Sequence, residues 1–293
     1  MNNPSYSSDP IGLPVEKKPS AARNILVGLA FIALYFLMQS VVTIAITMYV
    51  SFTTSVGDYE TIALYQQAIT QKALAHTDLI VVGAAAITLL VIVLVFRKKL
   101  PAELNLKKIP FKVVLLGIVC GVACSFSLNL FFAFLPESWL ESYTEDSSLL
   151  AEGTFLSSLL STVVAAPIIE EVIFRGIGIS RFRKVMPTWL SVLIISVIFG
   201  VMHGNFVWFI YTFALGCGMG FVFVRQDSLW ASLAIHAGFN SVSMISFAIR
   251  DVSPATEYYV NLIYSAVTYA MIPIAALTLW LLLRRKIAGR SSQ

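Results

Sequence analysis

The stretch LIVVGAAAITLLVIVLVF, from Leu79 to Phe96, carries no charged side chain and decides the fold class. A helix needs about 20 mainly apolar residues to cross the hydrocarbon core of a bilayer. Seven further segments have the same character, which gives eight predicted spans at 25–50, 78–96, 111–135, 154–179, 188–205, 207–224, 228–248 and 259–283. We therefore predict an all-α, polytopic transmembrane helical bundle, with spans five and six forming a tight hairpin around Asn205.

The composition supports a membrane protein. The 293 residues are 58% hydrophobic and only 12% charged, whereas soluble globular chains carry about 25% charge. The mean hydropathy is +0.82. Cys120, Cys124 and Cys217 all fall in apolar stretches, so we interpret them as small packing residues and not as a disulfide framework.

The distribution of basic residues predicts the orientation. If the N-terminus is inside, every Lys and Arg except Lys72 and Arg250 falls on the inner side, so the positive-inside rule predicts that both termini are cytoplasmic. The net charge of +4 thus reflects topology, and we expect no nucleic-acid partner. We expect no cleaved signal peptide, and a multi-pass protein of the cell membrane, specifically a bacterial plasma membrane. The outer loops hold the acids Glu137, Glu141, Glu145, Asp146 and Glu152.

The predicted organisation has five parts. It consists of a cytoplasmic polar tail at 1–24, a three-span region at 25–135, a core at 150–248, a last span at 259–283 and a basic cytoplasmic tail at 284–293. In the core, Gly200 and Gly204, and likewise Gly216 and Gly220, are four residues apart. Small residues at this spacing predict closely packed helices.

The fourth span contains Glu170 and Glu171 within an apolar run. Each carboxylate costs roughly 2.5–3.5 kcal/mol inside a membrane on insertion scales. Glu171 and Arg175 are four apart and can pair on one helical face. Glu170 points about 100° away from Glu171, so we expect it to face a cavity. Two adjacent carboxylates of this kind suit a proton acceptor.

Two of the three histidines lie within predicted spans. His203 follows Phe199 by four residues, and His236 precedes Asn240 by four, so each pair shares a helical face. His76 lies in an outer loop, and we interpret it as a solvated surface residue. Ionisable residues inside a membrane usually face the bundle interior or a water-filled cavity, which makes this group a candidate functional site.

These residues resemble the signature of the CPBP family (CAAX proteases and bacteriocin-processing enzymes, also called Abi), which are intramembrane proteases similar to type II CAAX prenyl endopeptidases. That signature is Glu-Glu-x-x-x-Arg, Phe-x-x-x-His and His-x-x-x-Asn or Asp on successive spans. It is matched by Glu170-Glu171-x-x-x-Arg175, Phe199-x-x-x-His203 and His236-x-x-x-Asn240. The resemblance covers roughly 150–248 and implies peptide-bond hydrolysis in a membrane cavity open to the cytoplasm, with Glu170 as the essential carboxylate and His203 as its partner on the water.

The residues leave two chemical routes open. In the metal-free route, which we favour, Glu170 is the general base, His203 orients the water, and Asn240 or His236 stabilises the oxyanion. No cofactor is then required. In a zinc route, His203, His236 and Glu170 would be the metal ligands.

Two other classes of function compete with a protease. The alternative is a non-catalytic membrane partner, acting in bacteriocin self-immunity or in regulation of sensor kinases, as relatives of the family suggest. The other is a proton-coupled transporter using Glu170 and His236, for which we find no inverted repeat. The expected partners of a protease are a peptide or membrane-protein substrate and the lipid bilayer.

Overall fold

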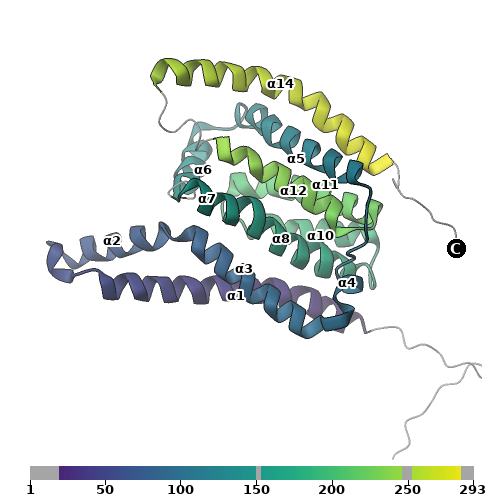
Figure 1. Ribbon diagram of the computed structural model, residues 1–293, viewed down its shortest axis with the longest axis horizontal. Helices are drawn as coiled ribbons and strands as arrows, with labels where there is room; N and C mark the ends of the chain where they lie inside the picture. The colour runs from purple at the N-terminus through teal and green to yellow at the C-terminus, as the bar shows by residue number, and fades with distance from the viewer. Residues whose placement is uncertain (1–19, 150–152, 246–252, 285–293) are drawn as a thin grey trace, which may run out of the picture.

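The computed structural model describes residues 20–149, 153–245 and 253–284, in which helices are joined by short loops and no strand occurs (Figure 1). The predicted all-α fold is confirmed for these ranges. Residues 1–19 of the polar tail, 285–293 of the basic tail and 246–248 of the seventh predicted span lie outside them, as do Glu152 and Arg250.

Six helices in the described ranges are long and apolar enough to cross a membrane, namely Ala21–Thr53, Thr77–Glu103, Phe111–Phe132, Phe155–Phe182, Phe206–Gln226 and Tyr258–Arg284. The other two predicted spans correspond to shorter helices. These are α10 (Thr188–Val201) and α12 (Leu229–Ser241), the latter followed by the 3₁₀ turn η5 (Val242–Met244). The chain is therefore a polytopic membrane protein.

The first layer is a hairpin of α1 (Ala21–Thr53) and α3 (Thr77–Phe96), which lie side by side. The segment between them, expected to be a loop, contains a turn, η1 (Val56–Asp58), and a helix, α2 (Ile62–Leu74). Ile69 and Ala73 of α2 pack on Ile46 and Val50 of α1. The mixed polar and apolar sequence of α2 gave no span signal, because only one of its faces is buried.

The opposite layer consists of α5 (Phe111–Phe132), which packs between α12 and α14 (Pro254–Arg284). The connection from α3 to α5 contains η2 (Arg97–Lys99) and α4 (Leu100–Glu103), and α6 (Glu137–Leu149) follows α5. A Cβ on Gly121 would overlap the main-chain carbonyl oxygen of Ile235, and one on Gly238 would overlap that of Ile118. The α5–α12 crossing is thus a backbone-to-backbone contact that only glycine permits.

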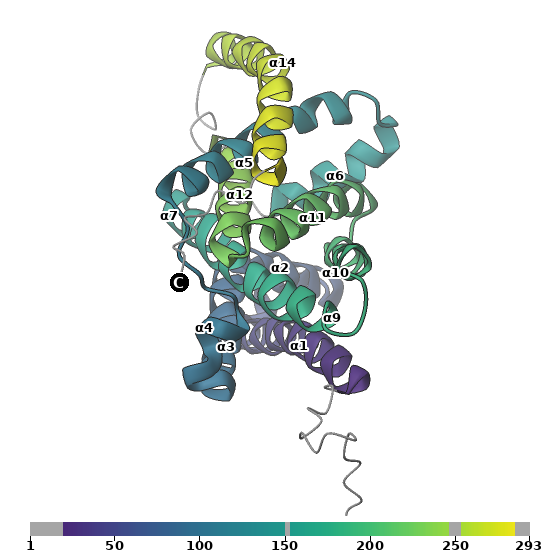
Figure 2. The ribbon, with the colours of Figure 1, turned by 90° about the vertical axis from the view of Figure 1, so that its right-hand side faces the viewer.

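Between these layers runs one long helix made of successive segments (Figure 2). It comprises α7 (Phe155–Ser158), the π-helical η3 (Leu159–Ala165), α8 (Ala166–Glu170), the π-helical η4 (Glu171–Ile179) and α9 (Ser180–Phe182). It contacts α1 and α3 on one side and α10, α11 (Phe206–Gln226) and α12 on the other. The helix that carries Glu170 and Glu171 therefore lies at the centre of the bundle.

The predicted hairpin of spans five and six is confirmed as α10 and α11. Asn205 caps α11 by accepting a hydrogen bond from the Val207 amide at 2.8 Å, and Gly204 makes the turn with φ +78°. Gly216 faces Phe199 and Gly220 faces Val192, as close packing predicts, and a Cβ on Gly220 would lie 2.8 Å from Val192. Gly204 has no such neighbour, so its glycine serves the turn and not the packing.

Candidate active site

The two glutamates lie where the central helix changes register. Glu170 ends α8 and Glu171 begins η4, a π-helical segment. π-Helical turns place successive side chains differently from an α-helix and are frequent at functional sites. Glu171 points into the bundle with 0% of its side chain exposed, whereas 17% of the Glu170 side chain is exposed. Glu171 is thus held in the interior and Glu170 is reachable, as their spacing on the helix predicts.

Glu171 is paired with Arg175, as expected. Nη1 of Arg175 donates to Oε1 of Glu171 at 2.8 Å, and only 1% of the arginine side chain is exposed. Nη2 of Arg175 also donates to the Gly216 carbonyl at 3.3 Å. A buried ion pair needs such additional hydrogen bonds to offset its desolvation. Gly216 thus serves both the helix packing and the site.

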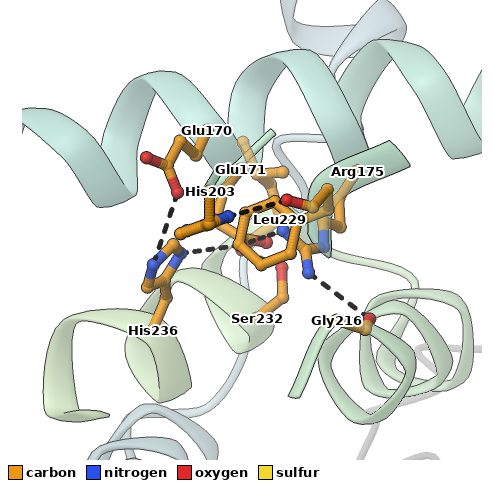
Figure 3. A network of polar contacts seen from close by, with 9 residues as sticks. Glu170, Glu171, Arg175, His203, Gly216, Leu229, Ser232 and His236 are labelled. Carbon is orange, nitrogen blue, oxygen red and sulfur yellow. Dashed lines mark hydrogen bonds and ion pairs between the residues drawn. The ribbon is translucent and has the colours of Figure 1, made fainter. Parts of the chain in front are cut away.

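His236 joins the two carboxylates (Figure 3). Its Nδ1 lies 3.0 Å from Oε1 of Glu171, and its Nε2 lies 3.6 Å from Oε2 of Glu170. Both ring nitrogens face carboxylate oxygens, and both can donate only in the imidazolium form. A protonated His236 and Arg175 would together balance the charge of both glutamates, so the cluster can be neutral as a whole.

Phe199 connects His203 to this cluster. Its ring centroid lies 4.5 Å from Cζ of Arg175, an arrangement that favours a cation–π contact. The same ring lies 4.8 Å from the ring of His203 and 6.0 Å from the ring of His236. Phe199, the aromatic residue of the second motif, therefore packs against the arginine and against both imidazole rings.

The tautomer of neutral His203 follows from its hydrogen bond. Nδ1 lies 2.7 Å from the carbonyl oxygen of Phe199, four residues earlier on α10. A carbonyl can only accept, so Nδ1 carries the proton and the lone pair of the neutral ring is on Nε2. The half-buried His203 can therefore accept a hydrogen bond through Nε2.

Asn240 has a different position from the rest of the predicted site. Its side-chain amide donates to the carbonyl of Thr162 at 2.8 Å. In η3 the amide of Ala166 bonds to the carbonyl five residues earlier, and the residue that would do the same for Thr162 is Pro167, which has no N–H. Asn240 thus satisfies a carbonyl that the proline leaves open, and its second N–H remains available.

No preformed set of metal ligands occurs among the described residues. Within the described ranges no group of three or more His, Cys, Asp or Glu side chains is arranged to hold a metal ion. Both nitrogens of His236 already face carboxylates, so a zinc route would require this ring to turn. His76 is exposed, as predicted, and Cys120, Cys124 and Cys217 are free thiols.

Two polar clusters were not predicted from the sequence. Asp78 at the start of α3 accepts hydrogen bonds from Ser157, Ser158 and Ser161, which ties α3 to the central helix. At the other end of the bundle, Asp227 pairs with Lys107 and accepts from Asn105. The clustered serines 157, 158 and 161 were a visible signal. The second cluster joins residues far apart in the chain and gave none.

The fold and this site define a polytopic helical membrane protein with a buried cluster of ionisable groups beneath one reachable carboxylate. Residues 152–242 match the family described as "Type II CAAX prenyl endopeptidase Rce1-like". The chain is also 30% identical over 90 residues to the "Putative membrane peptidase YdiL" of Bacillus subtilis (strain 168), a match that covers 31% of this chain and 36% of that protein. No solved structure matches the chain.

The family match includes all three motifs, from Glu170 to Asn240. Both matches support assignment to the CPBP, or CAAX protease, family. They do not favour a non-catalytic partner. The aligned segment spans about a third of the relative. The family match at 152–242 covers the central helix, α10, α11 and α12.

Proposed function

We propose that this chain is an intramembrane endopeptidase of the cell membrane that hydrolyses a peptide bond with water activated by Glu170 and His203. The observation that carries the proposal is the contrast between the two adjacent glutamates. Glu171 is sealed in an ion pair with Arg175, whereas Glu170 remains partly exposed, with Nε2 of His236 3.6 Å from its carboxylate. One carboxylate is thus structural, and the other is available for proton transfer.

In the proposed reaction, Glu170 takes a proton from water whose hydrogen bond to Nε2 of His203 orients it. The hydroxide oxygen attacks the peptide carbonyl carbon, and the carbonyl oxygen becomes an oxyanion. Its donors are the second N–H of Asn240 and Nε2 of His236, which turns from the Glu170 carboxylate to the oxyanion as Glu170 takes up the proton. The C–N bond then breaks, and Glu170 returns the proton to the leaving amine.

We propose that this route needs no metal. Glu170 supplies the proton transfer and His203 orients the water, so neither step calls for a metal. The purified protein is expected to keep its activity in the presence of a chelator and to contain no stoichiometric zinc. Loss of activity with the chelator, restored by added zinc, would instead support the ligand set of His203, His236 and Glu170.

The decisive experiment is a peptide-cleavage assay in detergent that compares the wild type with Glu170→Gln. The variant keeps the shape of the side chain and removes the base, so we expect activity to fall by about 10²–10⁴-fold with unchanged thermal stability. Glu141→Gln is the matched control because Glu141 is an exposed glutamate on α6. Equal activity of Glu170→Gln and the wild type would contradict the proposal.

A further inference from the structure

Asp78 gathers three hydroxyl groups of the central helix. It is the second residue of α3, and its carboxylate accepts hydrogen bonds from Ser157 at 2.6 Å, from Ser158 at 3.0 Å and from Ser161. Only 1% of Ser158 and 2% of Ser161 is exposed. A Cβ on Gly153 would lie 2.1 Å from Oδ2 of Asp78. The chain before α7 therefore closes over the carboxylate, and a larger residue at this glycine would displace it.

The serines that bind Asp78 lie on both sides of the point where the π-helical segment begins. Ser158 is the last residue of α7, whereas Ser161 lies within η3. Main-chain hydrogen bonds in a π-helix span five residues and not four. This register is rare in proteins, so side chains from neighbouring helices are needed to keep η3 in it.

η3 is held from two sides at adjacent residues. On one side α3 binds the Ser161 hydroxyl through Asp78. On the other side α12 binds the Thr162 carbonyl through Asn240, whose amide donates at 2.8 Å. The two helices lie on opposite sides of the central helix (Figure 1). We call Asp78, Ser161, Thr162 and Asn240 the η3 clamp.

Asp78 is too far from the reacting groups to take part in the reaction directly. Ser161 precedes Glu170 by nine residues, or roughly 14 Å at ~1.5 Å per residue. η3 leads into α8, which ends at Glu170. A change of register in η3 would turn α8 about its axis and so aim Glu170 differently. It would also move the Thr162 carbonyl that orients Asn240.

We propose that Asp78 is a positioning residue of the active site. By binding Ser161 it keeps η3 in its π-helical register, and it thereby sets Glu170 and Asn240 for the reaction. This inference rests on the proposed function, in which Glu170 is the base and Asn240 an oxyanion donor. It adds the α1–α3 hairpin, which lies outside the family match at 152–242, to the parts of the protein on which cleavage depends.

The test compares two serines that bind the same carboxylate. Ser161→Ala removes the hydroxyl in η3, and Ser158→Ala removes an equally buried hydroxyl in α7. We expect Ser161→Ala to lower kcat of peptide cleavage in detergent about tenfold or more at unchanged KM, because the clamp positions reacting groups and does not bind substrate. Ser158→Ala should cleave at close to the wild-type rate. Asp78→Ala should behave like Ser161→Ala, which serves alone if the aspartate variant does not fold.

A double-mutant cycle tests whether Asp78 acts through the turn that Asn240 holds. In the Asn240→Ala background, Asp78→Ala should have little further effect on kcat, because residues that act on one element are not additive. Full multiplication of the two effects on kcat would overturn the inference, as would equal kcat values for Ser161→Ala and Ser158→Ala.

Hydrogen–deuterium exchange gives a readout that does not depend on cleavage. Amides of η3 should exchange faster in Ser161→Ala than in the wild type or in Ser158→Ala, and the same difference should appear when Glu170→Gln is present. Unchanged exchange in η3 would show that Asp78 does not hold its register. Equal activity of Glu170→Gln and the wild type would instead remove the peptidase proposal, so the two failures are distinguishable.

Discussion

The Nε2 atom of His236 lies 3.6 Å from the carboxylate of Glu170, while its Nδ1 atom is held at 3.0 Å by the neighbouring glutamate. This single ring therefore transmits the position of the buried ion pair to the reachable carboxylate. Changes to the pair should act on both stability and activity, whereas changes on the open side should act on activity alone.

The first prediction concerns the buried pair. Glu171→Ala leaves Arg175 without a counter-charge in the interior, and breaking a buried pair typically costs about 3–5 kcal/mol. We expect a large drop in the thermal unfolding temperature in detergent. The double variant Glu171→Ala/Arg175→Met removes both charges and should be more stable than the single variant. If the single variant unfolds at the wild-type temperature, the pair is not a structural element.

The second prediction concerns His203. His203→Ala removes the half-buried ring that we assign to the water, and it removes the hydrogen bond from Nδ1 to the Phe199 carbonyl at the exposed end of α10. Peptide cleavage should fall by about 10²-fold or more with little change in unfolding temperature. His76→Ala, at an exposed histidine, is the control and should cleave at the wild-type rate. An active His203→Ala enzyme would remove this residue from the mechanism.

The third prediction concerns the hydrogen bond between Asn240 and Thr162. Asn240→Ala leaves the half-buried Thr162 carbonyl without a donor, which costs at most about 1–3 kcal/mol, the value for a fully buried polar group. Pro167→Ala restores a main-chain N–H, so the double variant should lose less stability than the sum of the single variants. Strict additivity in thermal unfolding would show that the proline and the asparagine are not coupled.

The fourth prediction concerns the crossing of α5 and α12. Gly121→Val would force the helices apart, because a Cβ there meets the main chain of Ile235 and Phe239, and overpacking costs about 1–3 kcal/mol or more. His236 follows Ile235 directly, so activity should fall as well. Gly83→Ala is the control, since its Cβ would make ordinary contact with Val42 at 3.5 Å. Normal size-exclusion behaviour and activity of Gly121→Val would contradict this view.

Local spacing made part of the site predictable. The Glu171–Arg175 pair and the contact of Phe199 with His203 both follow from positions four apart on a helix. The contact of His236 with both glutamates could not be derived, because it depends on how α12 lies against the central helix. The hydrogen bond of Asn240 to the Thr162 carbonyl could not be derived for a similar reason, since it depends on the π-helical turn that precedes Pro167.

The fold, too, could be predicted only where the sequence signal is local. Continuous apolar runs predicted the long helices. The helices α2 and α6 were not predicted, because their sequences mix polar and apolar residues. The glycines of the second half indicated close packing. Gly117 and Gly121 on α5 have the same spacing, but their importance depends on the α12 backbone that they meet.

The shortness of α10 has a consequence for the surrounding lipid. One face of this helix is apolar and exposed along its whole length, through Trp189, Leu193, Val197 and Val201. A helix of about 21 Å is shorter than the roughly 30 Å hydrocarbon layer of a bilayer, and such a mismatch thins the membrane locally. Headgroups and water beside α10 would therefore sit deeper than elsewhere around the protein, and acyl-chain length becomes a variable that tunes turnover.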